Sequence, residues 1–109
     1  MQLDLLLTYK ALAAAALLAT TGAALAQDAA ALRQQALAAT CANCHGTQGR
    51  AVDGAAVPGL AGMPAVYLVE QMKAFKAGTR PATVMHQLAK GYSDAQIDQI
   101  AAYFAAQKK

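Results

Sequence analysis

Cys41-Ala42-Asn43-Cys44-His45 is the stretch that decides the fold of this chain. Two thiols stand three positions apart, and an imidazole follows the second thiol directly. This spacing is that of covalent haem attachment, in which both thiols add to haem vinyl groups as thioethers. His45 would then lie under the iron and bind it through one ring nitrogen. We therefore predict one covalent haem c, held by Cys41, Cys44 and His45.

Three other kinds of site use the same residue types. A thioredoxin-like redox pair requires a βαβ context, and the sequence has no strand pattern around the cysteines. A closed zinc site requires four ligands, and only His45 and His86 are left to join the two thiols. A disulfide is an option in an exported protein. Haem attachment is favoured because the histidine is adjacent to the second cysteine.

Residues 1–26 have the pattern of an export signal. An apolar, Ala-rich run from Leu12 to Leu18 follows Lys10, and Ala24-Leu25-Ala26 provides an A-x-A cleavage site. The run is short for a membrane span, which requires about 20 apolar residues, and an uncleaved anchor is the alternative. We expect a secretory signal peptide at 1–26 that is cleaved near Ala26. A periplasmic monohaem cytochrome c domain at 27–109 would remain, without stable membrane insertion.

The expected mature chain is small and only slightly basic. A polypeptide core of this size is marginal without a staple, and a covalent haem supplies a large apolar plate for short helices. The formal net charge is +3, and it is unchanged by cleavage because Lys10 and Asp4 leave together. So modest a charge argues against nucleic-acid binding and is consistent with docking to a protein partner.

The first expected helix runs from Asp28 to Thr40 and delivers the chain into Cys41. Asp28 is its predicted N-cap. Small apolar residues at helical spacing predict its buried face, namely Ala29, Leu32, Ala36 and Ala39. Stretch 46–62, which follows the cysteine motif, is interrupted by glycines and a proline and predicts a loop.

Two further helices are expected, with a loop at Pro81–Gly91 between them. One runs from Pro64 to Ala77, because proline suits a first helical turn and Gly78 suits a C-terminal cap. The other runs from Asp94 to Gln107 behind a capping box of Ser93 and Gln96. The apolar faces expected are Leu68, Met72 and Phe75 in the former and Ile97, Ile100, Ala101 and Phe104 in the latter.

The sixth iron ligand is expected to be a methionine. Haem in an electron carrier commonly has two axial ligands. Met72 lies in the middle of a helix, where core packing is the better interpretation, and Met63 is a poor candidate close to the proximal segment. Met85 lies in a loop that can reach the opposite haem face, so we predict iron ligation by His45 and Met85. The rival is His86, which we interpret as a solvent-facing loop histidine.

The sequence resembles the class I c-type cytochromes over residues 28–107. The cysteine motif and Met85 carry this likeness, and Pro58-Gly59-Leu60-Ala61-Gly62 matches the family's P-x-L-x-G segment. The resemblance implies an all-α fold in which three main helices and loops wrap around one haem. It also implies that the Pro58 carbonyl accepts a hydrogen bond from His45 Nδ1 and that Leu60 packs on the proximal haem face.

A narrower resemblance is to the cytochrome subunit of flavocytochrome c sulfide dehydrogenase and to the wider cytochrome c4 group. It rests on the segments Tyr67–Phe75, Arg80–Met85 and Ala89–Asp94. Some members of both groups carry two haems, whereas this chain has one cysteine motif. The likeness implies a one-electron carrier that accepts electrons from a flavoprotein subunit of a sulfide dehydrogenase or from another redox protein.

Two other functions are kept beside that one. The first is a free soluble shuttle of the cytochrome c4/c5 type between respiratory complexes. The second is a gas sensor or peroxidase-like haem protein, which requires an open sixth position and is disfavoured by Met85. The sequence contains no paired carboxylates and no nucleophile beside a base, so the chain is not expected to be an enzyme by itself.

Weaker expectations concern the surroundings of the haem. Arg50 and Arg80 flank the two covering loops, and either guanidinium can pair with a haem propionate. Two sets of residues are expected around the exposed haem edge: the lysines Lys73, Lys76 and Lys90, and the apolar residues Met63, Val66 and Tyr92. An exposed apolar cluster would favour a lasting partner, and a rim of lysines alone would favour a transient one.

Overall fold

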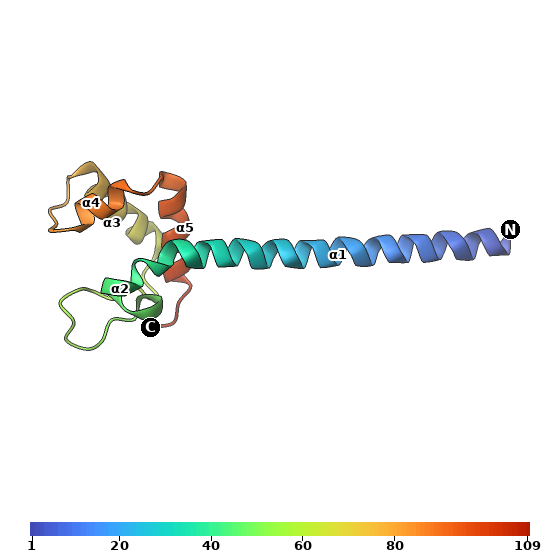
Figure 1. Ribbon diagram of the computed structural model, residues 1–109, viewed down its shortest axis with the longest axis horizontal. Coiled ribbons are helices and arrows are strands. Elements are labelled where there is room, and N and C mark those ends of the chain that lie inside the picture. The colour runs from blue at the N-terminus through green and yellow to red at the C-terminus, as the bar shows by residue number, and fades with distance from the viewer. The chain divides into compact units, whose positions relative to one another are not determined.

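The computed structural model describes the backbone of residues 1–109 and the side chains of 1–13 and 27–109. The chain divides into two compact units, Met1–Arg33 and Gln34–Lys109. Helix α1 spans Gln2–Ala39, and its residues 34–39 belong to the second unit (Figure 1). Within the described residues, no helix combines the length and apolar character that crossing a membrane requires. The expected cleavage site at Ala24–Ala26 lies outside the described side chains, so the signal peptide stays a prediction.

The predicted start and buried face of the first helix are wrong. Asp28 lies inside α1 instead of capping it, because alanine and leucine, which are strong helix formers, dominate the sequence on both sides. Leu32 is 65% exposed, whereas Ala38 is buried and Leu37 packs against the core. In so Ala-rich a helix there is little contrast between faces, so helical spacing does not identify the buried one.

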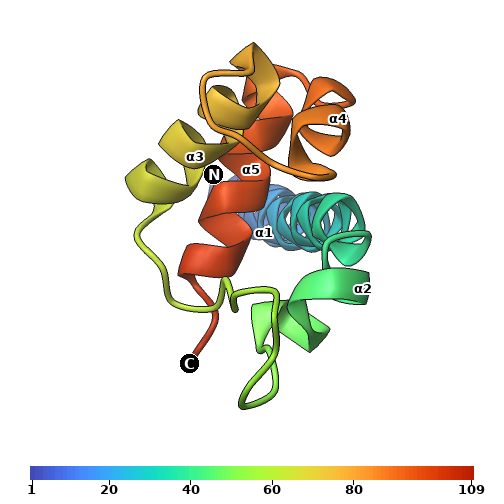
Figure 2. The ribbon, with the colours of Figure 1, turned by 90° about the vertical axis from the view of Figure 1, so that its left-hand side faces the viewer.

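The second unit is built from short helices, and the described part of the chain contains no strand. After α1 come α2 (Ala42–His45), the 3-10 turn η1 (Thr47–Gly49), α3 (Ala65–Ala77), α4 (Met85–Lys90) and α5 (Asp94–Ala105). Figure 2 shows α5 at the centre of this unit, with α3 on one side and α2 with the end of α1 on the other. The prediction of an all-α fold is confirmed.

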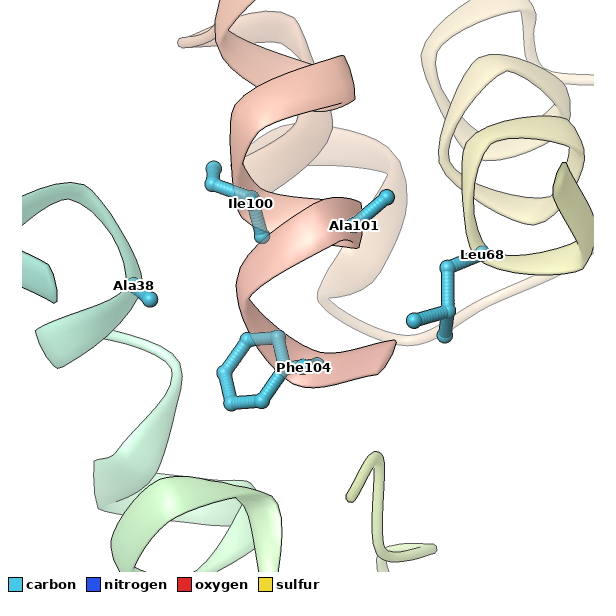
Figure 3. Packing of buried hydrophobic residues seen from close by; sticks show 5 residues of the cluster. All are labelled: Ala38, Leu68, Ile100, Ala101 and Phe104. Atoms are coloured by element: carbon cyan, nitrogen blue, oxygen red, sulfur yellow. The ribbon is translucent and has the colours of Figure 1, made fainter. Parts of the chain in front are cut away.

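Helix α5 supplies most of the hydrophobic core. Ile100, Ala101 and Phe104 lie between Ala38 of α1 and Leu68 of α3 (Figure 3), and all five are buried. Ile97, one turn earlier, is also fully buried. The buried face predicted for this helix is therefore correct. Truncation of a buried phenylalanine such as Phe104 to alanine costs about 3–5 kcal/mol in typical cores.

The C-terminal end of α3 and the N-terminal end of α5 follow the expected capping rules, whereas Pro64 is the N-cap of α3 and not part of its first turn. Gly78 has a φ of 78° and its N–H donates to the last turn of α3, as a C-terminal glycine does. Ser93 Oγ accepts a hydrogen bond from Gln96 N at 3.2 Å, and Gln96 Oε1 accepts one from Ser93 N at 2.8 Å. The predicted capping box is thus present. Helix α5 ends at Ala105, slightly before the predicted Gln107.

The predicted loop at Pro81–Gly91 is wrong in its second half, which forms α4. Pro81 prevents α3 from continuing, but it places no restriction on the residues from Met85 onward. Met, Gln, Leu, Ala and Lys all have good helix propensity, and Ala89 is fully buried. Helix α4 packs against α3. Met85 is the first residue of this helix and does not lie in a loop.

Candidate haem site

The cysteine motif forms a single helical turn. His45 N donates to Cys41 O at 2.9 Å, and Gly46 N donates to Ala42 O at 3.0 Å. Positions three and four apart are neighbours on a helix surface, so this turn groups Cys41, Cys44 and His45. The thiols are not joined in a disulfide; Cys41 is half-buried and Cys44 is exposed. Burial raises the pKa of the Cys41 thiol, against a smaller lowering by the Thr40 side-chain hydrogen bond.

His45 is the buried polar residue of the described core, and it is fixed by a backbone contact. Its Nδ1 lies 2.6 Å from the Pro58 carbonyl oxygen. A carbonyl can only accept, so Nδ1 carries the proton and donates. This tautomer leaves a lone pair on Nε2, the nitrogen that can bind iron. The hydrogen bond that the family resemblance implied is therefore present.

The loop after the motif folds back onto the core. Gly49 O accepts hydrogen bonds from Leu60 N at 2.7 Å and from Ala61 N at 3.1 Å, and Gly62 N donates to Phe104 O at 2.9 Å. These contacts bring Pro58 to His45 although they are thirteen positions apart. Leu60, expected on a haem face, packs against the core cluster, as Cys41 does.

Replacement of Gly46 by alanine is expected to destabilise the domain strongly. Gly46 has φ 85° and ψ 159°, a region essentially restricted to glycine. A Cβ there would also lie 2.0 Å from the Arg50 carbonyl oxygen. We expect a loss of about 3 kcal/mol in unfolding free energy, measured by denaturant titration of the haem-loaded protein.

Gly54→Ala is the matched control, because Gly54 also has a positive φ of 78° but has open space around its Cβ position. It should cost only about 1 kcal/mol. Equal losses for the two variants would show that the contact with Arg50 is unimportant.

Met85 and His86 lie together in the first turn of α4, and both are half-buried. The interpretation of His86 as a solvent-facing loop residue is therefore wrong. Its Nδ1 is closed off from solvent and has no hydrogen-bond partner within the described chain. A buried polar atom without a partner costs about 1–3 kcal/mol, so this nitrogen points to a polar group that the polypeptide itself does not provide.

The residues present fit a covalently bound haem. The motif offers two unpaired thiols on one helical turn and a buried imidazole whose Nδ1 is already committed to Pro58. Beside Met85, the buried nitrogen of His86 lacks a partner. Among the side chains that are described, no three His, Cys, Asp or Glu residues gather as a site for a bare metal ion.

The two arginines expected near the propionates have partners on the chain. Arg50 Nε donates to Lys108 O at 2.8 Å, and its Nη1 contacts Gln48. The Arg80 guanidinium contacts Gln71 and stands 4.5 Å from the centre of the Phe75 ring. Each guanidinium has five N–H donors, which leaves capacity for a further acceptor. Propionate binding by Arg50 or Arg80 stays a prediction.

Two of the three rim lysines are already paired. Lys76 Nζ donates to Asp94 Oδ1 at 3.0 Å and to Tyr92 O at 2.7 Å, and Lys73 Nζ lies 3.7 Å from Asp94 Oδ2. The hydrogen bond and charge of Lys76, followed by the charge of Lys73, lower the pKa of Asp94. Only Lys90 among the three is exposed without an ion pair in the described structure.

The expected apolar cluster does not form on the surface. Val66 is 71% exposed, but Met63 and Tyr92 are half-buried and pack against the core. Both residues flank helices, and a sequence pattern does not show which flanking residues fold inward. The three residues thus do not form one exposed apolar cluster, which is the condition given above for a lasting partner.

The Asp94 pairing predicts a specific pH dependence. Because the folded-state pKa of Asp94 is lowered, its stabilising effect is complete above the ordinary carboxyl pKa and is lost as the pH falls through the lowered value. Asp94→Asn should therefore reduce the acid sensitivity of stability below about pH 4. Thermal midpoints of the haem-loaded proteins from about pH 6 to about pH 2 measure this. Asp98→Asn, on the exposed side of the same helix, is the control and should leave the profile unchanged.

Several known proteins are similar to this chain. The thiosulfate dehydrogenase electron acceptor of Thiomonas intermedia is 41% identical over 71 residues, covering 65% of this chain and 33% of that protein. The cytochrome subunit of sulfide dehydrogenase from Chlorobaculum tepidum is 39% identical over 72 residues, covering 66% and 64%. The chain thus spans between a third and two thirds of the length of these relatives.

A solved structure of cytochrome c4 from Acidithiobacillus ferrooxidans superposes with a TM-score of 0.57 and 38% identity, over 61% of this chain and 37% of that one. The cytochrome c family model matches residues 22–108, which include the second unit except for its last residue, Lys109. The chain therefore belongs to the cytochrome c family and is an all-helical electron-transfer domain of the monohaem type with covalently bound haem c.

Proposed function

We propose that this chain accepts single electrons from a sulfide-oxidising flavoprotein and passes them to another redox protein, without being an enzyme by itself. Support comes from its 39% identity to a cytochrome subunit of sulfide dehydrogenase. The site agrees with this role, because a buried His45 with its Nδ1 bonded to Pro58 is a ligand held in a single orientation. Little rearrangement of the protein is then required when the charge of the iron changes.

Each residue of the proposed haem site has a specific role. Cys41 and Cys44 would hold the haem as thioethers, His45 Nε2 would bind the iron, and the Pro58 carbonyl would keep the imidazole oriented and basic. Met85 would be the second protein ligand of the iron, and a thioether ligand would raise the reduction potential above that of a bis-histidine haem. The haem supplies a one-electron iron couple. Leu60 covers the proximal haem face.

Electron balance fixes the stoichiometry with the donor. Oxidation of one sulfide to sulfur releases two electrons, so two molecules of a one-electron carrier are reduced per sulfide. The donor flavoprotein takes up both electrons and passes them on singly.

Export is part of the same proposal. Bacterial c-type cytochromes are generally periplasmic, and we propose cleavage of the signal peptide near Ala26. The mass of the native protein tests this directly, because cleavage leaves Gln27 as the first residue. A native protein that keeps residues 1–26 would instead be an uncleaved form.

A free shuttle of the cytochrome c4/c5 type is the second candidate. It is favoured by the inward packing of Met63 and Tyr92, which removes the apolar surface expected for a lasting partner. The similarity to a cytochrome c4 structure is consistent with it.

The deciding experiment mixes the haem-loaded protein with a sulfide-oxidising flavoprotein and sulfide, and follows haem reduction by stopped flow. A thiosulfate dehydrogenase with thiosulfate is the parallel arm. Val66→Glu should slow reduction by the true donor if the exposed Val66 lies in the docking surface, and Val52→Glu, at a valine 79% exposed, is the matched control. If the flavoprotein neither forms a complex with the protein nor reduces its haem above background, the free-shuttle function is favoured.

A further inference from the structure

Tyr92 contacts three segments of the domain through its side chain and its backbone. Its hydroxyl lies 2.9 Å from Thr40 Oγ1, and its carbonyl accepts the hydrogen bond from Lys76. Its N–H donates to Ala89 O at 3.3 Å, and its ring packs against the core cluster. Tyr92 thus joins the ends of α1, α3 and α4 immediately before α5 begins.

These contacts link the two sides of the site. Thr40 directly precedes Cys41, so it is continuous with the cysteine motif. Ala89 belongs to α4, which begins at Met85, and Gly91 N donates to Leu88 O at 3.1 Å. Tyr92 therefore follows α4 after a single residue, Gly91, and is hydrogen-bonded to its last turn.

We propose that the Thr40–Tyr92 hydrogen bond ties the end of α4 to the residue that precedes the cysteine motif and thereby keeps the Met85 thioether in place to bind the iron. Thr40 and Tyr92 are then positioning residues, acting on Met85 through α4. The inference rests on the proposed ligation by His45 and Met85. In this proposal an external ligand such as imidazole would bind the iron only after the Met85 thioether leaves it, and α4 would then move away from Thr40. That movement breaks the Thr40–Tyr92 contact.

The size of the effect follows from the value of one hydrogen bond. The net contribution of a neutral hydrogen bond corresponds to roughly a two- to twelvefold change in an equilibrium constant. Loss of the Thr40–Tyr92 bond should increase the open fraction by that factor. The apparent affinity for an external ligand rises in proportion to the fraction of protein that is competent to bind it.

Imidazole titration of the ferric haem-loaded protein tests this in a double-mutant cycle. Tyr92→Phe and Thr40→Val should each tighten imidazole binding by roughly two- to twelvefold. The double variant should bind no more tightly than the tighter of the two single variants, because both remove the same bond. The cycle is required because Thr40 directly precedes Cys41, so its replacement also changes the surroundings of the motif.

Gln34→Leu is the matched control. Gln34 Nε2 donates to Gln99 O at 2.9 Å and so ties α1 to α5 by a bond of the same length that does not involve α4. This variant should lower the unfolding midpoint and leave imidazole affinity unchanged.

The outcomes separate this inference from the function on which it rests. If the wild-type ferric protein lacks a sulfur-to-iron charge-transfer band, Met85 does not bind the iron. The inference is then wrong together with the proposed ligation. A wild-type protein that has the band, but whose Tyr92→Phe variant binds imidazole as the wild type does, would overturn the inference alone. Fully additive effects in the double variant would also overturn it.

Discussion

Replacement of both Cys41 and Cys44 by alanine is expected to abolish covalent haem attachment. In a host with cytochrome c maturation, the wild-type protein should keep its haem through denaturation and acid–acetone extraction, because two thioether bonds survive both treatments. The double variant should lose all of its haem to the acetone phase, since His45 and Met85 would hold it only by coordination. Pyridine haemochrome spectra of the two phases measure this.

Single substitutions sharpen that test. Cys41→Ala should leave one thioether at Cys44, with haem still covalent and a less stable holoprotein. Asn43→Ala changes the same turn without removing a thiol, and its side chain is exposed, so it should keep both bonds. If haem extracts freely from the wild-type protein, the assignment of the cysteine motif as a covalent haem attachment site is wrong.

The parts of the fold that were predictable are those encoded over a few neighbouring residues. The capping box at Ser93 and Gln96 requires only a serine and a glutamine three positions apart. The buried face of α5 stands out because large apolar residues alternate with polar ones at helical spacing. The Cys-x-x-Cys-His turn is equally local.

The features that the sequence did not predict are of two kinds. Either the residues along a helix differ too little in polarity, or the contact joins residues that are distant in sequence. Helix α1 is so rich in alanine that spacing selected Leu32, whereas Ala38 is the buried residue. Helix α4 is six residues long, too short for a periodic pattern to be distinguished from a loop. The ion pair of Lys76 with Asp94 joins residues that are distant in sequence, so no local pattern indicated it.

The haem site likewise combines features that are encoded locally with contacts between residues distant in sequence. The hydrogen bond between His45 and Pro58 spans a glycine-rich loop, and only the resemblance to a known family indicated it. The Thr40–Tyr92 bond spans 52 positions, and nothing in the local sequence of either residue points to the other. Polar contacts between residues this far apart in sequence can be identified only once the fold is known.

Met85→Ala is expected to remove the long-wavelength sulfur-to-iron charge-transfer band of the ferric protein. The thioether is the only sulfur proposed to bind the iron, so its loss should also lower the reduction potential and open the iron to external ligands. Imidazole affinity should rise by roughly tenfold or more, because no internal ligand has to leave first. Visible and near-infrared spectra, with a potentiometric titration, measure all three changes.

His86→Ala is the control that separates the two neighbours in the first turn of α4. His86 is half-buried and its Nδ1 lacks a partner, so it is the alternative axial ligand. If Met85 binds the iron, His86→Ala retains the charge-transfer band and the low-spin spectrum. If His86→Ala removes the low-spin spectrum while Met85→Ala preserves it, the haem is bis-histidine and its potential lies lower. A thioether at the iron favours uptake of electrons from a reducing donor, so this pair of variants also bears on the direction of electron flow.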